Sequence, residues 1–457
     1  MIHKMQLSSI AQSLDGKLHG NDASFERVCT DTRTLQKGDL YIALVGENFN
    51  GNHFVESAAA NGACAAIVSE LSEHSLPQLE VVDTTKALGG LAKLNRLASA
   101  ARVAAITGSQ GKTSVKEMLG KIMSCVDTTL VTQGNFNNHI GVPLTLMDLA
   151  QEHEFAVIEL GASGPGEIAY TVDMVKPDVC VITNAAETHV EGFGSLQGVV
   201  ETKGEIIDGV QEDGVVVLNA SDANFAQWLA RAGAKKVVTF AVQLNESTVQ
   251  SDYLACDVSN LDGISNKFVL RTPIGEVDVQ LALPGNHNVA NAAAAAAVAI
   301  EMGASLSQVK EGLSKVNPVP GRLAKCKGIG GFTLIDDSYN ASPSSFKAAI
   351  DVLAANDGKK VLIMGDMGEL GEKTTGEHRA VGQYAAQAKI NELWAVGKFS
   401  ALAAKSFGVN GKHFESQDAL VEFANDNLDQ KTVALVKGSR SAAMDNIVKR
   451  LKSGELA

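Results

Sequence analysis

The residues with the clearest chemical meaning form the segment TGSQGKTS at positions 107–114. This segment follows an apolar stretch at 103–106 and opens a helical pattern, which is the strand-turn-helix context of a phosphate-binding loop. Its glycines let backbone N–H groups turn towards phosphate oxygens, its lysine neutralises them, and its threonine hydroxyl can ligate Mg²⁺. The predicted nucleotide-binding residues of the loop are Gly108, Ser109, Gln110, Gly111, Lys112, Thr113 and Ser114.

This loop is shorter than the common phosphate-binding motif G-x-x-x-x-G-K-[ST], because the first glycine of that pattern would fall at Ile106. A glycine-rich turn with an incidental lysine is therefore an alternative interpretation. The strand pattern before the loop and the helical pattern after it make this alternative the weaker one.

Three further residues are candidates for binding the metal ion that accompanies a nucleotide. Glu159 ends the apolar segment FAVIE, so a carboxylate is presented at the end of a buried strand beside the phosphate loop. His189 lies in TNAAETH and Lys203 lies in ETKGEI. A single histidine or lysine is more often a hydrogen-bonded buried residue or a surface residue. The assignment of His189 and Lys203 as metal ligands therefore depends on the other candidates, Thr113 and Glu159. Two divalent cations would need more ligands than Thr113 and Glu159 supply.

Composition restricts the class of protein. The 457 residues suggest roughly three domains at one domain per ~150 residues. With 39 basic and 52 acidic residues the net charge is -13, which argues against a nucleic-acid scaffold or a basic membrane-surface protein. No stretch approaches about 18 apolar residues, and the first residues lack the apolar core of a signal peptide. We therefore expect a cytoplasmic protein, without membrane insertion, whose six scattered cysteines are reduced.

The elements that must position these residues fall into three α/β units. Residues 1–82 alternate helical patterns with short apolar segments. Residues 83–315 contain the phosphate loop and strand candidates apolar enough to be buried on both faces of a parallel sheet. The sequence NPVPG at 317–321 combines two prolines and a glycine that neither a helix nor a central strand tolerates. We place a boundary there, so that the third domain covers 316–457.

The third domain alternates strand and helix patterns, which is typical of a doubly wound sheet. Its polar loops follow the carboxyl ends of the strands, where such sheets bind ligands. A helix is expected to open at Ser342 and Pro343, a cap followed by a first-turn proline. The strands expected along the whole chain are 40–44, 65–68, 103–106, 155–158, 179–183, 215–218, 332–335, 361–364, 393–396 and 432–436.

Eight segments together resemble the Mur ligase family in their order and approximate spacing: TGSQGKTS, NFNNHIGVP, ELGAS, TNAAETH, KGEI, PGNHNVANAAAA, PGR and DDSYNASP. Each is modest alone, but their ordered co-occurrence over nearly the whole chain is specific. The resemblance implies an α/β fold of three domains. These are a small N-terminal domain that binds a uridine-nucleotide substrate, a central P-loop ATPase domain with a mostly parallel sheet, and a C-terminal Rossmann-like doubly wound ligase domain.

The resemblance also implies roles for individual residues. In the family, the lysine that matches Lys203 is carbamylated by CO₂, which turns a cation into a carboxylate-like group near the metals. Asn288 and Asn291 of GNHNVAN would bind the adenine, although a helix cap is an equally good interpretation of Asn288. Arg322 would reach the ATP phosphates when the third domain closes, and Asp337 would contact the ribose.

Within the family, DDSYNASP, VLIMGDMGELG and LVKGSRSAAMD resemble the ligases that add D-alanyl-D-alanine to UDP-N-acetylmuramoyl tripeptide. The DNPR motif usual in the diaminopimelate-adding sibling is absent, and Ser342 stands where an asparagine is commoner. The segment CTDTRTLQKGDLYIALVGENFNGNHF resembles the uridine pocket, although residues 31–33 alone would suggest an ordinary polar loop. The candidate substrate-binding residues are Thr32, Arg33, Asn137, Asn138, Asn340, Asp366, Lys437 and Arg440.

The reaction implied by the resemblance is ATP-dependent amide formation through an acyl phosphate, with two Mg²⁺ ions. We expect small-molecule substrates, no nucleic-acid partner and a monomer. Closure of the third domain would exclude water from the acyl phosphate. The expected catalytic residues are Lys112, Glu159, His189, Lys203 and Arg322.

Two alternatives stay open. A sibling amide ligase, such as a folylpolyglutamate synthase, would share the phosphate loop and the metal-binding residues but not the uridine-pocket segment. A P-loop nucleotide switch would need a partner-controlled hydrolysis cycle, and a guanine-binding member usually carries NKxD. The nearest segment here, NKFV at 266–269, lacks the aspartate.

Overall fold

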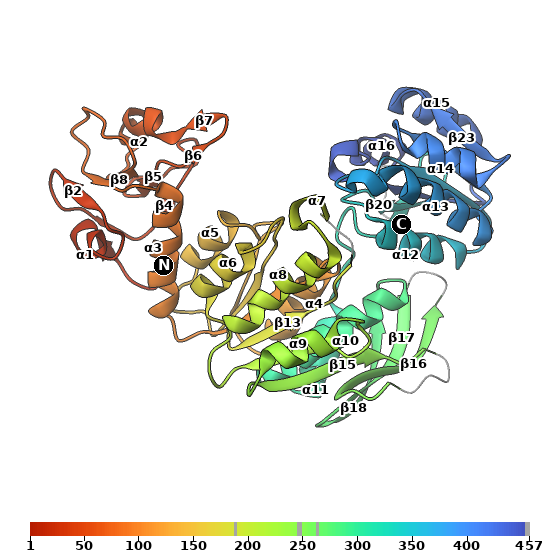
Figure 1. The fold of residues 1–457 in the computed structure, drawn as a ribbon, viewed down its shortest axis with the longest axis horizontal. Helices are drawn as coiled ribbons and strands as arrows, with labels where there is room; N and C mark the ends of the chain where they lie inside the picture. Colours follow the sequence, from red (N-terminus) through yellow and green to blue (C-terminus); the bar gives the residue numbers. More distant parts are fainter. Residues whose placement is uncertain (187–189, 245–248, 262–264, 453–457) are drawn as a thin grey trace.

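The computed structural model describes residues 1–186, 190–244, 249–261 and 265–452 as three α/β domains that follow one another along the long axis of the molecule (Figure 1). Among these residues, no helix is long and apolar enough to cross a membrane.

The N-terminal domain contains a five-stranded sheet in the order β2-β9-β8-β5-β4, in which β2 alone is antiparallel to its neighbour. The expected strands at 40–44 and 65–68 are confirmed as β5 and β8. The elements are β1 Met5–Gln6, α1 Leu7–Ala11, β2 Lys17–His19, β3 Ser24–Phe25, β4 Val28–Cys29, β5 Leu40–Ile42, β6 Val45–Gly46, β7 Phe49–Asn50, α2 Val55–Ala60, β8 Ala65–Val68 and β9 Gln78–Glu80.

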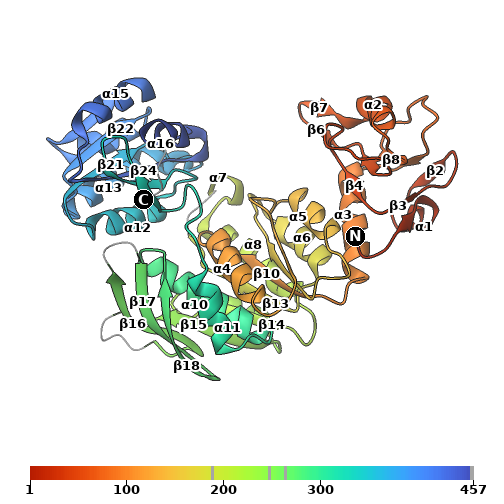
Figure 2. The same ribbon diagram turned by 180° about the vertical axis from the view of Figure 1, so that it is seen from behind.

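Helix α3, Thr84–Leu97, joins this domain to the next (Figure 2). It starts at Asp83, whose carboxylate accepts hydrogen bonds from the first-turn N–H groups of Thr85 and Lys86. Its buried Asn95 accepts from the Ile2 N–H and donates to two carbonyls at the end of α5. One hydrophobic cluster therefore runs from the N-terminal sheet through α3 into the central domain.

The central domain contains a nine-stranded sheet in the order β11-β12-β10-β13-β14-β15-β16-β17-β18. The strands from β11 to β16 are parallel, and β17 and β18 continue the sheet antiparallel. The strands are β10 Arg102–Thr107, β11 Thr129–Val131, β12 Phe155–Glu159, β13 Val179–Ile182, β14 Val215–Asn219, β15 Lys236–Val242, β16 Tyr253–Leu261, β17 Ser265–Thr272 and β18 Gly275–Leu281.

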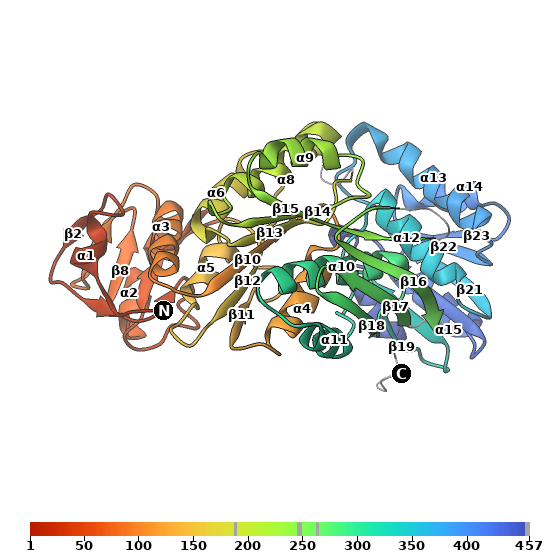
Figure 3. The same cartoon turned by 90° about the horizontal axis from the view of Figure 1, so that it is seen from below.

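Helices cover both faces of this sheet (Figure 3). On one face lie α4 Lys112–Met123, α10 Asn286–Glu301 and α11 Leu306–Ser314, and the other face carries α5 Gly141–Met147, α6 Glu167–Val175, α8 Leu196–Asp208 and α9 Phe225–Ala232. The short helix α7 spans Val190–Phe193. The alanine-rich stretch at 292–297 lies in α10, where small side chains let the helix pack closely on the sheet.

The C-terminal domain is doubly wound, with a six-stranded sheet in the order β19-β20-β24-β21-β22-β23. Only β19 is antiparallel. Helix α12 opens with Ser342 as its cap and Pro343 in the first turn, as expected from the sequence. The elements are β19 Ala324–Lys327, β20 Thr333–Asp337, α12 Pro343–Ala354, β21 Lys359–Met364, α13 Thr374–Gln387, β22 Glu392–Val396, α14 Ser400–Phe407, β23 Gly411–Phe414, α15 Gln417–Asn427, β24 Thr432–Lys437 and α16 Asp445–Leu451.

Candidate active site

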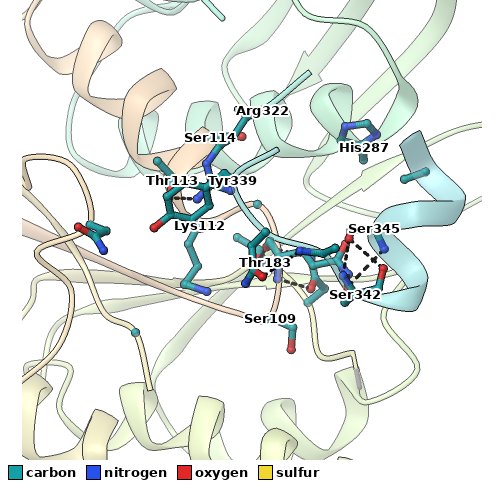
Figure 4. A pocket seen from close by; sticks show the side chains of 18 of the residues that line it. Ser109, Lys112, Thr113, Ser114, Thr183, His287, Arg322, Tyr339, Ser342 and Ser345 are labelled. Atoms are coloured by element: carbon teal, nitrogen blue, oxygen red, sulfur yellow. Dashed lines mark hydrogen bonds between the residues drawn. The ribbon is translucent and has the colours of Figure 1, made fainter. Parts of the chain in front are cut away.

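A cavity of about 910 Å³ lies between the central and C-terminal domains (Figure 4). The central domain contributes residues that follow the carboxyl ends of β10, β12 and β13, which are adjacent strands of the sheet. The C-terminal domain contributes residues after β20 and β24. Ligands of open α/β sheets bind at such strand ends, so the topology favours this cavity as the site of chemistry.

The phosphate loop connects β10 to α4 at the floor of this cavity. Gly111 has φ +80° and precedes the first residue of α4. Gly108 has φ +144°, and a Cβ there would lie 1.9 Å from the hydroxyl of Thr183. Both glycines are therefore required by the backbone path. Lys112 Nζ donates to the Gly108 carbonyl at 2.8 Å, so the lysine lies back along its own loop, and burial lowers its pKa.

Glu159 lies at the end of β12 with 1% of its surface exposed. Its Oε1 accepts from Asn137 Nδ2 at 2.8 Å and from the Thr113 hydroxyl at 3.3 Å. Its Oε2 is buried and has no hydrogen-bond partner. A buried carboxylate oxygen needs a partner, and its position beside a threonine hydroxyl fits a divalent cation. Within the described residues no three His, Cys, Asp or Glu side chains gather to bind a metal, so phosphate or other oxygens would complete the coordination.

Lys203 lies on α8 with 2% of its surface exposed. Burial lowers its pKa to about 7, and the nearby charge of Lys112 acts in the same direction. Its Nζ lies 5.1 Å from the centre of the Phe193 ring. At neutral pH a substantial fraction of this amine is therefore uncharged. His189, the other expected metal ligand, lies outside the described residues.

Two contacts from the C-terminal side reach the phosphate loop. Arg322 Nη2 donates to the Thr113 hydroxyl at 3.0 Å, and its guanidinium lies 4.4 Å from the centre of the Tyr339 ring. Gln110 Nε2 donates to the Ser342 hydroxyl at 3.0 Å. Ser342, which stands where an asparagine is commoner, both caps α12 and accepts a hydrogen bond from the phosphate loop. In this arrangement the two domains touch directly across the cavity.

The two expected adenine-binding residues lie in the first turns of α10 and line the cavity. Asn288 Nδ2 donates to the Pro284 carbonyl at 2.8 Å, and Asn291 Nδ2 donates to Asn288 Oδ1 at 3.3 Å. Sequence reasoning missed His287, which directly precedes Asn288, also lines the cavity, and has its pKa lowered to about 4 by burial. Its position within the segment GNHN, at 285–288, is the sequence feature that could have identified it as a cavity residue.

Three of the expected contacts in the C-terminal domain bind one another. Lys437 Nζ donates to Asp337 Oδ2 at 2.5 Å and to the Asn340 carbonyl at 3.0 Å. The other carboxylate oxygen of Asp337 accepts from the Leu323 N–H. The ion pair is buried at the cavity wall, and burial raises the pKa of Asp337. The Lys437–Asp337 pair therefore positions the backbone at Leu323 and Asn340. Arg440, 70% exposed, lines the same wall.

Other expected residues lie apart from the cavity or have backbone partners. Arg33 forms an exposed ion pair with Asp31 in the N-terminal domain, where Thr32 is its neighbour, and neither Thr32 nor Arg33 lines the cavity. Asn138 lines it, but its side-chain oxygen accepts from the Gly141 N–H at the start of α5. Asp366 does not line it, and its carboxylate accepts from two N–H groups at the start of α14.

His378, which has no role predicted from the sequence, binds two backbone groups. Its Nδ1–H donates to the Thr374 carbonyl at 2.7 Å, which leaves Nε2 to accept from the Met367 N–H at 3.0 Å. Burial lowers the pKa of this histidine, and the neutral form makes both bonds. His378 therefore joins α13 to the loop after β21.

Family models match three parts of the chain: the Mur ligase family catalytic domain at residues 24–96, the Mur ligase middle domain at 106–299 and the Mur ligase glutamate ligase domain at 321–440. The UDP-N-acetylmuramoyl-tripeptide–D-alanyl-D-alanine ligase of Escherichia coli strain K12 is 44% identical over 98% of each chain. The crystal structure of MurF from Acinetobacter baumannii is 35% identical over 98% of each chain, with a TM-score of 0.91. MurF ligase from Thermotoga maritima, in complex with ADP, is 26% identical, covers 93% of this chain and 96% of that chain, and has a TM-score of 0.82.

Proposed function

We propose that this chain, which belongs to the Mur ligase family, joins D-alanyl-D-alanine to UDP-N-acetylmuramoyl tripeptide in peptidoglycan precursor synthesis. It is an ATP-dependent ligase. One observation carries the proposal: a single cavity joins a phosphate loop, a buried carboxylate with an unpartnered oxygen and an arginine from the far side of the domain boundary. Identity of 44% over 98% of both chains supports the choice of substrates.

The proposed reaction has two steps. First, an oxygen of the terminal carboxylate of the tripeptide attacks the γ-phosphorus of ATP. An O–P bond forms as the bond to the β,γ-bridging oxygen breaks, and ADP leaves with that electron pair. Second, the neutral amine of the dipeptide attacks the acyl carbon. A C–N bond forms, inorganic phosphate leaves with the electron pair of the C–O bond, and the nitrogen loses a proton.

Lys112 and Arg322 supply positive charge for the first step. Lys112 is already within the phosphate loop, and the planar fork of Arg322 lies beside Thr113, so both cations are in place before charge develops. The cavity walls come from two domains, so closure of the C-terminal domain would exclude water from the acyl phosphate, whose hydrolysis would otherwise compete with amide formation.

Thr113 and Glu159 are the residues that would bind Mg²⁺, since Glu159 Oε2 lacks a protein partner. Bound Mg²⁺ neutralises phosphate oxygens and polarises the phosphoryl group that is transferred. His189 is proposed as a further ligand, for a second ion, from its place in the sequence alone.

Lys203 is proposed to carry a carbamate. The lone pair of its neutral amine attacks the carbon of CO₂, an N–C bond forms, one C=O electron pair moves onto oxygen, and the nitrogen releases a proton. The lowered pKa supports this chemistry, because the amine must be uncharged to react. The product is an anion on a buried side chain, which suits a position near metal ions.

The substrates are proposed to bind at opposite ends of the molecule and meet in the cavity. Thr32 and Arg33 would contact the uridine nucleotide in the N-terminal domain, where the Arg33 side chain is exposed. Asn137 and Asn138 would contact the peptide, and the dipeptide would bind near Arg440. Asn288 and Asn291 would bind adenine and Asp337 the ribose, while Asn340, Asp366 and Lys437 shape the dipeptide site.

The experiment that tests this function measures phosphate release from ATP and Mg²⁺ with UDP-N-acetylmuramoyl tripeptide, with and without D-alanyl-D-alanine. Release is expected only when both are present. Release with a single amino acid instead would assign the chain to a sibling ligase. Release that needs neither substrate would indicate a nucleotide switch.

Replacing Arg322 with alanine is expected to lower kcat by about 10- to 100-fold and to change the KM for the tripeptide by less than about twofold. The reason is that the guanidinium lies beside Thr113 in the phosphate loop. Steady-state kinetics of phosphate release check this. Arg322→Lys retains the charge without the planar fork, and Arg379→Ala removes an exposed arginine as a control. An unchanged kcat in Arg322→Ala would contradict the phosphate assignment.

Three further properties belong to the proposal. Dependence on ATP and a nucleotide-linked precursor suits the cytoplasm, and the proposed state of the enzyme is a monomer. The proposed domain boundaries are 1–82, 83–315 and 316–457. They are supported by α3, which starts at Thr84, and by β19, which starts at Ala324 after the linker.

A further inference from the structure

Lys116 is a buried lysine on the helix that carries the phosphate loop, and it lies outside the wall of the cavity. Its exposed fraction is 1%, and it lies one helical turn after Lys112 on α4. A buried ammonium group is costly unless hydrogen bonds and charges compensate it. An apolar side chain of similar length would fill this position at lower cost, so the charge requires an explanation.

The ammonium group of Lys116 binds the segment that follows β11. Its Nζ donates to the carbonyl of Thr132 at 2.9 Å and to that of Gly134 at 3.3 Å. The carboxylate of Glu117 lies 2.8 Å from the same nitrogen. Gly134 has φ +51°, which turns the chain at this point. The segment 132–137 is therefore attached to the helix whose first residue is Lys112.

The same segment binds Glu159 at its backbone and at its side chain. The Glu159 N–H donates to the Thr132 hydroxyl at 3.1 Å, and Asn137 Nδ2 donates to Glu159 Oε1 at 2.8 Å. The Asn137 carbonyl also accepts from the Gly161 N–H at 2.7 Å, just beyond β12. These bonds direct one carboxylate oxygen to the protein and leave Oε2 without a partner.

We infer that Lys116 is a positioning residue of the nucleotide site. By binding two carbonyls of segment 132–137 it fixes the Glu159 carboxylate relative to Thr113 and the phosphate loop, without contacting the nucleotide. Lys116 therefore contributes to the gain in nucleotide affinity that Mg²⁺ provides, and not to the affinity for the nucleotide without metal. This inference rests on the ATP use in the proposed function and is independent of the peptide substrates.

The test compares the affinity for ADP, by titration calorimetry, in excess EDTA and in Mg²⁺. The ratio of the two affinities reports the metal contribution alone. Lys116→Met retains the apolar stem and removes the ammonium group. We expect it to lower the ratio by about 10- to 100-fold and to change the affinity in EDTA by less than about twofold, as for groups that orient metal ligands. Lys116→Arg retains donors for both carbonyls and should restore most of the ratio.

Two further variants make the result decisive. Lys121→Met makes the same change at an exposed position of the same helix and should leave the ratio unchanged. Thr132→Val removes the hydroxyl that binds the Glu159 N–H, retains the carbonyl that binds Lys116, and should lower the ratio as Lys116→Met does. If Lys116→Met does not fold, Thr132→Val carries the test.

An unchanged ratio in folded Lys116→Met or in Thr132→Val would overturn the inference. So would equal losses of ADP affinity with and without Mg²⁺, because they would indicate general damage to the site. A wild-type chain that does not bind ADP in Mg²⁺ would instead contradict the ATP use of the proposed function.

Discussion

The Lys203→Ala variant is expected to lose ligase turnover by about 10²- to 10³-fold, and added acetate or propionate is expected to restore part of it. Lys203 is buried on α8 and its pKa lies near 7, so its amine can add CO₂ at neutral pH. Alanine removes the proposed carbamate and leaves space that a short carboxylate can enter. The measurement is phosphate release at saturating substrates, with and without the carboxylate.

A second variant distinguishes a carbamate from a simple cation at this position. Arginine stays protonated and cannot add CO₂, so Lys203→Arg should be as inactive as Lys203→Ala and should resist rescue because its side chain fills the space. Substantial activity in Lys203→Arg would show that a positive charge is what the site needs. Labelling with ¹³C-bicarbonate gives an independent readout, since a carbamate carbon signal should appear in the wild type and in neither variant.

The Lys112→Met variant is expected to lower kcat/KM for ATP by about 10²- to 10³-fold, which is the cost of removing one preorganised charge at a transferring phosphoryl group. Lys112 Nζ lies 2.8 Å from the Gly108 carbonyl oxygen, within the loop that lines the cavity. Methionine retains an unbranched apolar side chain of similar length and removes the ammonium group, with its charge and its hydrogen bond to Gly108. Initial rates over a range of ATP concentrations measure the effect.

Lys121→Met is the matched control, because it makes the same change at an exposed position of α4. Its kcat/KM for ATP should equal that of the wild type within about twofold. The KM for the tripeptide should be similar in all three proteins. A Lys112→Met enzyme that retains wild-type kcat/KM for ATP would refute the role of the phosphate loop in catalysis.

The sequence predicted the strands that carry the site because their burial leaves an unambiguous pattern. The segments before Gly108 and Glu159 are apolar on both faces, since helices cover both sides of the sheet. Each segment is followed by polar residues that line the cavity. The strands β20, β21, β22 and β24 of the C-terminal domain were predicted for the same reason, and its two edge strands β19 and β23 were not. The antiparallel strands β17 and β18 were not, because they alternate buried and exposed residues at the edge of the sheet.

Pairings between distant side chains could not be predicted from one sequence. Lys437 and Asp337 are 100 positions apart and bind each other at 2.5 Å, although each alone suggested a ligand contact. The Asp366 carboxylate similarly binds N–H groups of Phe399 and Ser400. The burial of Lys116 could not be predicted from the sequence, because a lysine on an amphipathic helix is usually exposed. Only the fold shows that its ammonium group is enclosed. The roles of these residues in substrate binding stay predictions.

The hydrophobic cluster that runs through α3 has a consequence for how the chain folds. Residues of the N-terminal sheet, of α3 and of one face of the central sheet share this cluster, whereas the C-terminal domain has two clusters of its own. We therefore expect the first two domains to unfold together. The last domain is a second unit, joined through the proline-containing linker at 317–321. Rigid-body rotation about that linker can occur without unfolding either unit.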